Sequence, residues 1–160
     1  MRLARAALGC RLREGLFLFA VLALGFALGL TVAFPAWAAK YDSGATDTEI
    51  KIGNTIPYSG PASAYGVNGY AVQAYFRKVN AEGGVNGRKI NFISLDDGYS
   101  RPKTVEQIRR LVEQDQVLFV FYSLGTAPNS AIHKYMNQKK VPQLFVATGA
   151  SKWGNPKEYP

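Results

Sequence analysis

Hydroxyl side chains follow an apolar run near the middle of the sequence, and their position is suited to binding an anion. Ser123 and Thr126 come directly after the apolar residues 117–122, and Pro128 follows them. Proline is tolerated in a first helical turn, so a helix is expected over 128–139. The unpaired N–H groups at a helix start, together with hydroxyl donors, favour a carboxylate or another anion. The open alternative is that both hydroxyls serve only as turn and cap residues.

Few residues here could carry catalysis. Asp96 and Asp97 follow an apolar run, and paired carboxylates could serve acid–base chemistry, although a turn or cap role for Asp97 before Ser100 is the interpretation we favour. Cys10 and His133 are the sole cysteine and the sole histidine, and His133 falls among solvent-facing positions of its predicted helix. One histidine supplies neither a Ser-His-Asp set nor a metal-ligand cluster. We expect no enzyme, no cofactor and no metal site.

Residues 1–38 have the composition of a secretory signal peptide. Arginines at positions 2, 5, 11 and 13 precede an uncharged run, 15–39, and Ala36 and Ala38 form a small-residue cleavage site. We expect cleavage before Ala39 and export to the periplasm. An uncleaved anchor is the alternative, because the apolar run nearly spans a bilayer. Cys10 precedes the apolar core, so lipidation is not expected, and the exported part would contain no cysteine.

In the rest of the chain, stretches with the apolar pattern of a β-strand alternate with stretches that have the apolar pattern of a helix. After a polar tail, 39–48, apolar patterns predict strands at 49–56, 89–95, 117–122 and 141–147, with helices over 64–81, after Ser100, and over 128–139. The first helix is expected to face inward through an apolar stripe of Val67, Tyr70, Ala71, Ala74, Tyr75 and Val79. Strands that alternate with single helices predict an α/β fold, a parallel sheet with flanking helices and right-handed crossovers.

Ligands of parallel α/β sheets bind outside the carboxyl ends of the strands. Loops 58–65, 123–126 and 148–151 all follow predicted strands, and all are rich in Ser, Thr, Gly and Tyr. They predict one polar rim for a small ligand. The chain carries a formal net charge of +8 over 160 residues, but its basic residues outside the leader are scattered. A nucleic-acid partner is therefore not expected.

Three segments of the chain, occurring in the same order as in the family, resemble the N-terminal lobe of branched-chain-amino-acid-type substrate-binding proteins of ABC transporters. They are TEIKIGNTIPYSGPASAYG, NAEGGVNGRKINFISLDDGYSRPKTVEQIRRLV and VPQLFVATGAS. The resemblance runs from about Glu49 to the end, and it implies a type I periplasmic-binding (Leu/Ile/Val-binding-like) fold. In such proteins two lobes close around an amino acid, an aromatic carboxylate or an amide, and deliver it to a membrane permease. Residues 49–160 would then form a partial N-terminal lobe, and the second lobe would be missing.

The same resemblance assigns ligand-binding roles to individual residues. It places an aromatic wall at Tyr65 and the hydroxyl that binds the ligand carboxylate at Ser123, with Thr126 opening the following helix. A backbone-and-hydroxyl segment that completes the site falls on Gly149, Ala150 and Ser151. The cysteine pair of some family members has no counterpart in this chain.

Other classes of protein remain as alternatives at this point. Extracellular sensor domains share the same fold, and a non-functional fragment would have the same sequence. A nucleotide-binding Rossmann-like domain is less favoured, because Gly60, Gly66 and Gly69 lack the GxGxxG spacing.

Overall fold

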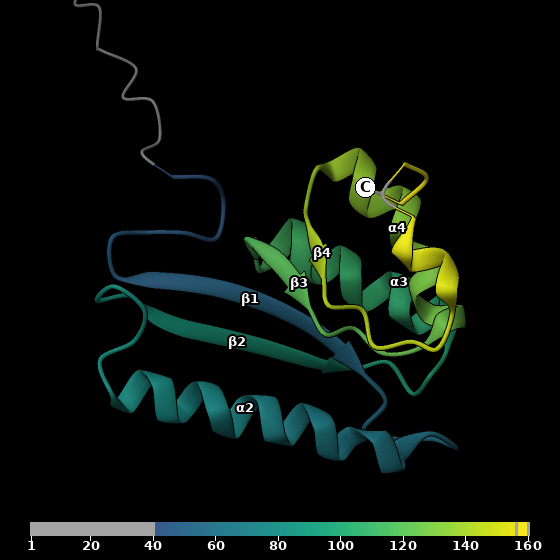
Figure 1. Ribbon diagram of the computed structural model, residues 1–160, viewed down its shortest axis with the longest axis horizontal. Coiled ribbons are helices and arrows are strands. Elements are labelled where there is room, and N and C mark those ends of the chain that lie inside the picture. The colour runs from purple at the N-terminus through teal and green to yellow at the C-terminus, as the bar shows by residue number, and fades with distance from the viewer. Residues whose placement is uncertain (1–40, 156, 160) are drawn as a thin grey trace, which may run out of the picture. The chain divides into compact units, whose positions relative to one another are not determined.

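The protein is described by a computed structural model over residues 41–155 and 157–159. The expected signal peptide, its cleavage site and Cys10 lie outside these residues. Four parallel strands form one sheet in the order β2-β1-β3-β4: β1 (Glu49–Ile56), β2 (Lys89–Asp96), β3 (Phe119–Phe121) and β4 (Gln143–Leu144) (Figure 1). The predicted α/β fold with a parallel sheet is confirmed.

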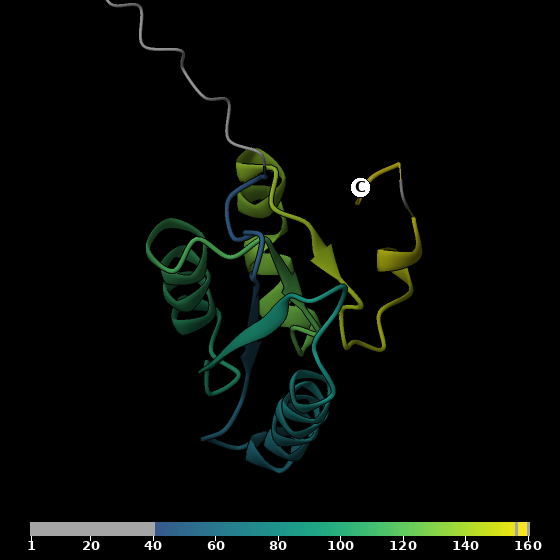
Figure 2. The same cartoon turned by 90° about the vertical axis from the view of Figure 1, so that its left-hand side faces the viewer.

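Helices connect consecutive strands and cover both faces of the sheet. They are α2 (Gly66–Ala81), α3 (Arg101–Arg109), which continues as one π-helical segment, Arg110–Gln114, and α4 (Thr126–Lys139). The connection from β1 to β2 moves toward one edge of the sheet, whereas the connections from β2 to β3 and from β3 to β4 move toward the other edge. Right-handed crossovers therefore place α2 on one face and α3 with α4 on the opposite face (Figure 2). None of the helices within 41–155 and 157–159 has the length and hydropathy needed to cross a membrane.

Strand lengths differ between the two halves of the sheet. β1 and β2 pair along their whole length, from Glu49 opposite Lys89 to Ile56 opposite Asp96. β3 and β4 are shorter than the predicted 117–122 and 141–147, and those bounds are wrong. The chain leaves the extended conformation at Tyr122 and Phe145, whose φ angles are 57° and 55°, so the ladders stop there.

The main core lies between the sheet and the helices α3 and α4. Its buried members come from all of these elements: Ile108, Leu111, Val117, Val120, Ile132 and Met136. The helix α3 and its π-helical continuation thus face the core through Ile108 and Leu111. Ser100 itself occupies the N-cap position, but its side chain makes no capping hydrogen bond.

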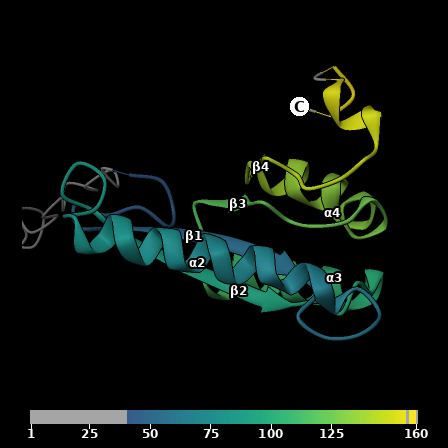
Figure 3. The same cartoon turned by 60° about the horizontal axis from the view of Figure 1, so that its bottom comes forward.

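The helix α2 packs along β1 and β2 through glycines (Figure 3). Gly66 and Gly69 are buried, and a Cβ at Gly69 would lie 2.3 Å from the hydroxyl oxygen of Tyr58. Only glycine permits this approach of helix to strand. The predicted inward stripe is therefore wrong, because Val67, Tyr70 and Tyr75 are exposed.

Two aromatic side chains, Phe121 of β3 and Phe145 just after β4, lie on the α2 side of the sheet. Phe121 contacts Phe76 of α2 at a ring-centroid distance of 5.8 Å and Phe145 at 5.7 Å. Phe145 is 76% exposed. In the part of the chain that the structure describes, this stretch of apolar sheet surface is open to solvent.

Candidate ligand-binding site

A cavity of about 420 Å³ lies at the carboxyl edge of the sheet, where the loops after all four strands meet. Its lining residues are Ala62, Tyr65, Asn68, Tyr99, Tyr122, Leu124, Gly125, Thr126, Ala147, Thr148 and Gly149. The structure therefore brings together Tyr65, Thr126 and Gly149, which were all expected from the sequence. Each of the three expected loops contributes to the cavity, and a fourth contribution comes from Tyr99, in the loop after β2.

Two hydroxyl groups stand together in the lining. Oγ1 of Thr126, in the first turn of α4, lies 2.7 Å from Oγ1 of Thr148, and the Thr148 oxygen accepts a 3.1 Å hydrogen bond from the Ala150 amide. When Thr148 donates to Thr126, the Thr126 proton is directed onward. A chain of this kind strengthens its terminal donor. Ala150 thus acts on the site through Thr148 and does not line the cavity.

Ser123 lies beneath the cavity and outside its lining. It is 1% exposed, and its hydroxyl donates to Oδ1 of Asn129 at 2.7 Å and accepts from Nε2 of Gln143 at 2.9 Å. Asn129 also donates to the carbonyls of Ser123 and Gly125, at 3.1 and 2.7 Å. This buried network holds the turn that leads into α4. Ser151, the last of the expected residues, is exposed at the start of a 3-10 helix, Ser151–Gly154, and is likewise outside the lining.

Tyr99 packs directly over Gly125. A Cβ at Gly125 would lie 2.5 Å from Cε2 of Tyr99, and Gly125 has a φ of 108°. Both the close contact and the backbone conformation require glycine at this position. The contact sets the Tyr99 ring against the start of α4, next to Thr126.

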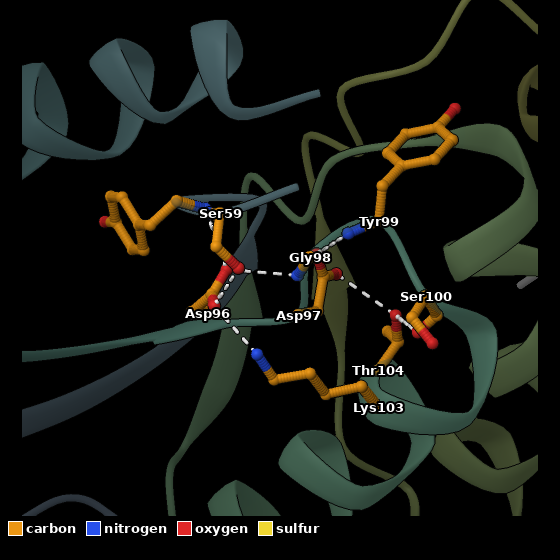
Figure 4. Close-up of polar contacts among 9 residues, drawn as sticks. Ser59, Asp96, Asp97, Gly98, Tyr99, Ser100, Lys103 and Thr104 are labelled. Atoms are coloured by element: carbon orange, nitrogen blue, oxygen red, sulfur yellow. Dashed lines mark hydrogen bonds and ion pairs between the residues drawn. The ribbon is translucent and has the colours of Figure 1, made fainter. Parts of the chain in front are cut away.

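Asp96 ties together two of the loops that form the rim (Figure 4). Its Oδ1 accepts from the amides of Tyr58, Ser59 and Gly98 at 2.9, 3.1 and 3.0 Å. Its Oδ2 accepts from the Ser59 hydroxyl at 2.6 Å and from Nζ of Lys103 at 2.7 Å. Burial alone would raise the pKa of Asp96, but the Lys103 and Ser59 contacts and the amides outweigh it and hold this pKa far below its usual range.

Asp97 is fully buried and serves the turn that was expected of it. It accepts from the amide of Tyr99 at 2.9 Å and from the Thr104 hydroxyl at 3.1 Å. Burial raises the pKa of Asp97, the opposite direction to that of its neighbour. Figure 4 shows the Tyr99 side chain directed away from both carboxylates. The pair therefore supports the rim and does not face the cavity.

A second cavity of about 260 Å³ lies beside α4 and the C-terminal residues, lined by His133, Asn137, Gln143, Phe145, Val146, Trp153 and Tyr159. The His133 ring is 5.4 Å from the Tyr159 ring and 5.9 Å from the Trp153 ring. His133 is half-buried, so the predicted solvent-facing position is wrong. Within residues 41–155 and 157–159, no cluster of His, Cys, Asp or Glu could hold a metal ion.

The site residues that sequence reasoning missed are Tyr99, Tyr122 and Thr148. Thr148 belongs to an expected loop, and its hydroxyl was the available signal. Tyr99 follows β2 just as Tyr65 follows β1, so the position of its loop at the carboxyl edge could have indicated it. Tyr122 was assigned as the last residue of the strand 117–122, and the positive φ at which the chain leaves the strand there has no sequence signal at a tyrosine.

The parallel α/β lobe matches part of a type I periplasmic-binding fold, as the solved structures described below show. The chain belongs to the periplasmic binding protein family, whose model matches residues 49–160. The Leu/Ile/Val-binding protein homolog 1 of Brucella abortus is 33% identical over 115 residues, covering 68% of this chain and 28% of that protein.

Solved structures are similar as well. A possible leucine/isoleucine/valine-binding protein from Rhodopirellula baltica has a TM-score of 0.61 at 29% identity, over 71% of this chain and 30% of that one. A solute-binding protein of an ABC transporter from Rhodopseudomonas palustris, in complex with 3,4-dihydroxy benzoic acid, has a TM-score of 0.56 at 28% identity, over 64% of this chain and 28% of that one. The chain thus spans less than a third of the length of these relatives.

Proposed function

We propose that this chain is part of the first lobe of the extracytoplasmic solute-binding component of an ABC importer, and that it binds a small carboxylate at the cavity. The observation that carries the proposal is the pair of hydroxyls of Thr126 and Thr148, 2.7 Å apart in the cavity lining. The pair lies at the first turn of α4, where unpaired N–H groups and the helix dipole favour negative charge.

Each lining residue has a distinct role in this proposal. Thr126 donates its hydroxyl proton to the ligand carboxylate, supported by Thr148 and, through it, by the Ala150 amide. Tyr65 covers the apolar part of the ligand, and the Gly149 carbonyl accepts from an ammonium group where the ligand has one. Ser123 supports the turn from below, since its hydroxyl is already engaged with Asn129 and Gln143.

Binding without catalysis fits the chemistry of the lining. The residues around the cavity include no acidic side chain, histidine or cysteine, and these are the usual general acids, bases and nucleophiles. The family is one of binding proteins. The proposed ligand class comprises amino acids, aromatic carboxylates and short amides, and the relatives above are named for ligands of the first two kinds.

The relatives' greater length supports a site shared between two lobes. In this proposal the cavity is one wall of a cleft, a second lobe supplies the other wall, and the closed protein delivers its ligand to a membrane permease. The leader-like residues 1–38 support a periplasmic location. The lobe alone leaves the site open to water, so we expect affinity no tighter than about 1 mM, equivalent to roughly −4 kcal/mol.

An NMR titration of the purified chain with benzoate and with leucine tests the carboxylate site. Thr126→Val removes the donor at nearly constant volume and should weaken binding of both by about fivefold, close to 1 kcal/mol. Thr48→Val is the matched control, because Thr48 is exposed at the opposite, amino end of β1. Equal affinities of the native chain and the Thr126→Val variant would overturn the proposal.

A further inference from the structure

We propose that Tyr99 and Tyr122 make this site selective for aromatic carboxylic acids, in which a short spacer, or none, joins the ring to the carboxylate. This inference rests on the proposed function and names its substrate class. Together with Tyr65, these residues place three phenol rings from three different loops around one cavity of about 420 Å³. Aromatic pairs gain about 0.5–1.5 kcal/mol beyond the area that they bury.

Part of the surface of Tyr65 and Tyr99 is exposed to solvent and could contact a ligand. Tyr65 is 57% exposed and Tyr99 is 40% exposed, although each borders the cavity. Large aromatic side chains are usually far more buried than this. A flat ring entering between them would cover surface that now faces water.

The backbone at Tyr99 and Tyr122 is held in a conformation that tyrosine seldom adopts. Their φ angles are 61° and 57°, and the left-handed conformation is unfavourable for a residue with a Cβ. At Tyr122 the strain is sustained by Asn54, a fully buried side chain that donates to the carbonyls of Phe121 and Tyr122 at 2.9 and 3.0 Å. At Tyr99 it is sustained by Asp97, which accepts from the Tyr99 amide. Glycine or asparagine would form either turn more easily, so the turns alone do not account for two tyrosines in the lining of one cavity.

The spacing of the aromatic wall and the hydroxyl pair restricts the length of the ligand. Tyr99 packs on Gly125, the residue directly before Thr126. A carboxylate on the Thr126 hydroxyl therefore has an aromatic face beside it.

The test compares two ligands with the same charge and carbon skeleton, one with a flat aromatic ring and one with a puckered saturated ring. The purified chain is titrated with benzoate and with cyclohexanecarboxylate, and the amide shifts of Gly125 and Thr126 are followed by NMR. Their ratio of affinities therefore measures the advantage of the flat aromatic ring. Benzoate should bind about 2- to 10-fold more tightly, which is the aromatic gain converted to a ratio.

Substitutions then assign the preference to the two residues. Tyr99→Leu and Tyr122→Leu should each lower the ratio toward one, whereas Tyr99→Phe and Tyr122→Phe should keep it. Tyr75→Leu, at an exposed tyrosine of α2 away from the cavity, is the matched control and should not change it. If a leucine variant fails to fold, the ratio in the native chain still decides.

The outcomes separate the two proposals. If cyclohexanecarboxylate or leucine binds the native chain as tightly as benzoate, the aromatic selectivity is refuted while the carboxylate site stands. A preference for benzoate that survives in both leucine variants also refutes it. If no carboxylate shifts these amides at concentrations well above the millimolar range, the proposed function itself fails, and the selectivity fails with it.

Discussion

The Ser123 hydroxyl donates a 2.7 Å hydrogen bond to Oδ1 of Asn129, and both side chains are buried beneath the first turn of α4. Asn129 in turn donates to the carbonyls of Ser123 and Gly125. A serine at the end of a strand and an asparagine inside the next helix therefore close the turn between them. The Thr126 hydroxyl, which we propose binds the ligand, and the Ser123 hydroxyl, which shapes the loop, lie only three residues apart in sequence.

Ser123→Ala should reduce stability and leave the cavity lining in place. Removal of one member of a buried hydrogen-bonded pair costs about 1–2 kcal/mol, and Asn129 keeps its contact with Gln143. Urea denaturation gives the loss, and NMR titration gives the affinity of the folded variant. Should affinity fall as far in Ser123→Ala as in Thr126→Val while stability is unchanged, Ser123 would be a direct ligand contact.

Gly125→Ala should destabilise the chain by about 2 kcal/mol or more, because a Cβ at φ 108° is strained and meets the Tyr99 ring. The double variant Tyr99→Ala/Gly125→Ala should recover the part that comes from the ring contact. Thermal or urea unfolding of the double-mutant cycle measures that part. Strict additivity of the two substitutions would contradict the packing of Tyr99 on Gly125.

Asp96→Asn should destabilise the chain at neutral pH by about 1–3 kcal/mol, since hydrogen bonds to a charged acceptor are lost. The pKa of Asp96 is lowered on folding, so its contribution is complete above the ordinary value of 3.8 and is lost as pH falls from there toward the lowered pKa. Urea unfolding from pH 7 to pH 2 should therefore give a flatter acid limb for the variant than for the native chain.

Asp97→Asn is the matched control for this acid response. The pKa of Asp97 is raised by burial, so ionisation of Asp97 above 3.8 opposes stability and its protonation in acid relieves that cost. The variant should keep the acid sensitivity that Asp96 confers, or show more of it. Identical pH profiles for both variants would contradict the opposite roles of the two carboxylates.

Phe145→Ser should reduce the binding of hydrophobic dyes. Phe145 is 76% exposed beside Phe121, and Val67, Tyr70 and Tyr75 add exposed apolar surface on α2. Such surface drives dye binding and self-association at micromolar concentration in the purified chain. Dye fluorescence and sedimentation measure both. A monomeric chain with a sharp cooperative melt and no dye binding would contradict this expectation.

The exported product should begin at Ala39, because Ala36 and Ala38 form a small-residue cleavage site after the apolar run. N-terminal sequencing of material from the periplasm checks this directly. A membrane-bound product that still begins at Met1 would favour an uncleaved anchor.

Much of the fold could be predicted because its signals are local. Alternating isoleucines give β1, a run of glycines and asparagine gives the turn before β2, and Pro102 lies in the first helical turn of α3 as its position indicates. The inward face of α2 could not be predicted in this way. Its glycines contribute nothing to an apolar pattern, yet they face the sheet because Tyr58 of the preceding loop occupies the space where larger side chains would lie.

The residues of the candidate site could likewise be predicted where their signal is local, and could not where it depends on distant contacts. Tyr65, Thr126 and Gly149 lie in loops that the strand pattern places at one edge, and all line the cavity. Ser123 is two residues past β3, where a change of backbone direction decides whether a side chain lies in the cavity lining or in the interior. That change occurs at Tyr122, through a hydrogen bond from Asn54 that is 68 residues distant in sequence. Such distant partners cannot be recognised from a local pattern.

Asp96 and Asn129, whose hydrogen bonds hold the loops, lie outside the cavity lining, whereas Tyr65, Tyr99 and Tyr122 belong to it. The parts that hold the loops are therefore separate from the parts that meet the ligand. A binding protein arranged in this way can acquire a new specificity by exchanging side chains at positions 65, 99 and 122 while its scaffold is retained. These positions are the natural choice for randomisation in a library of small-molecule biosensors built on this lobe.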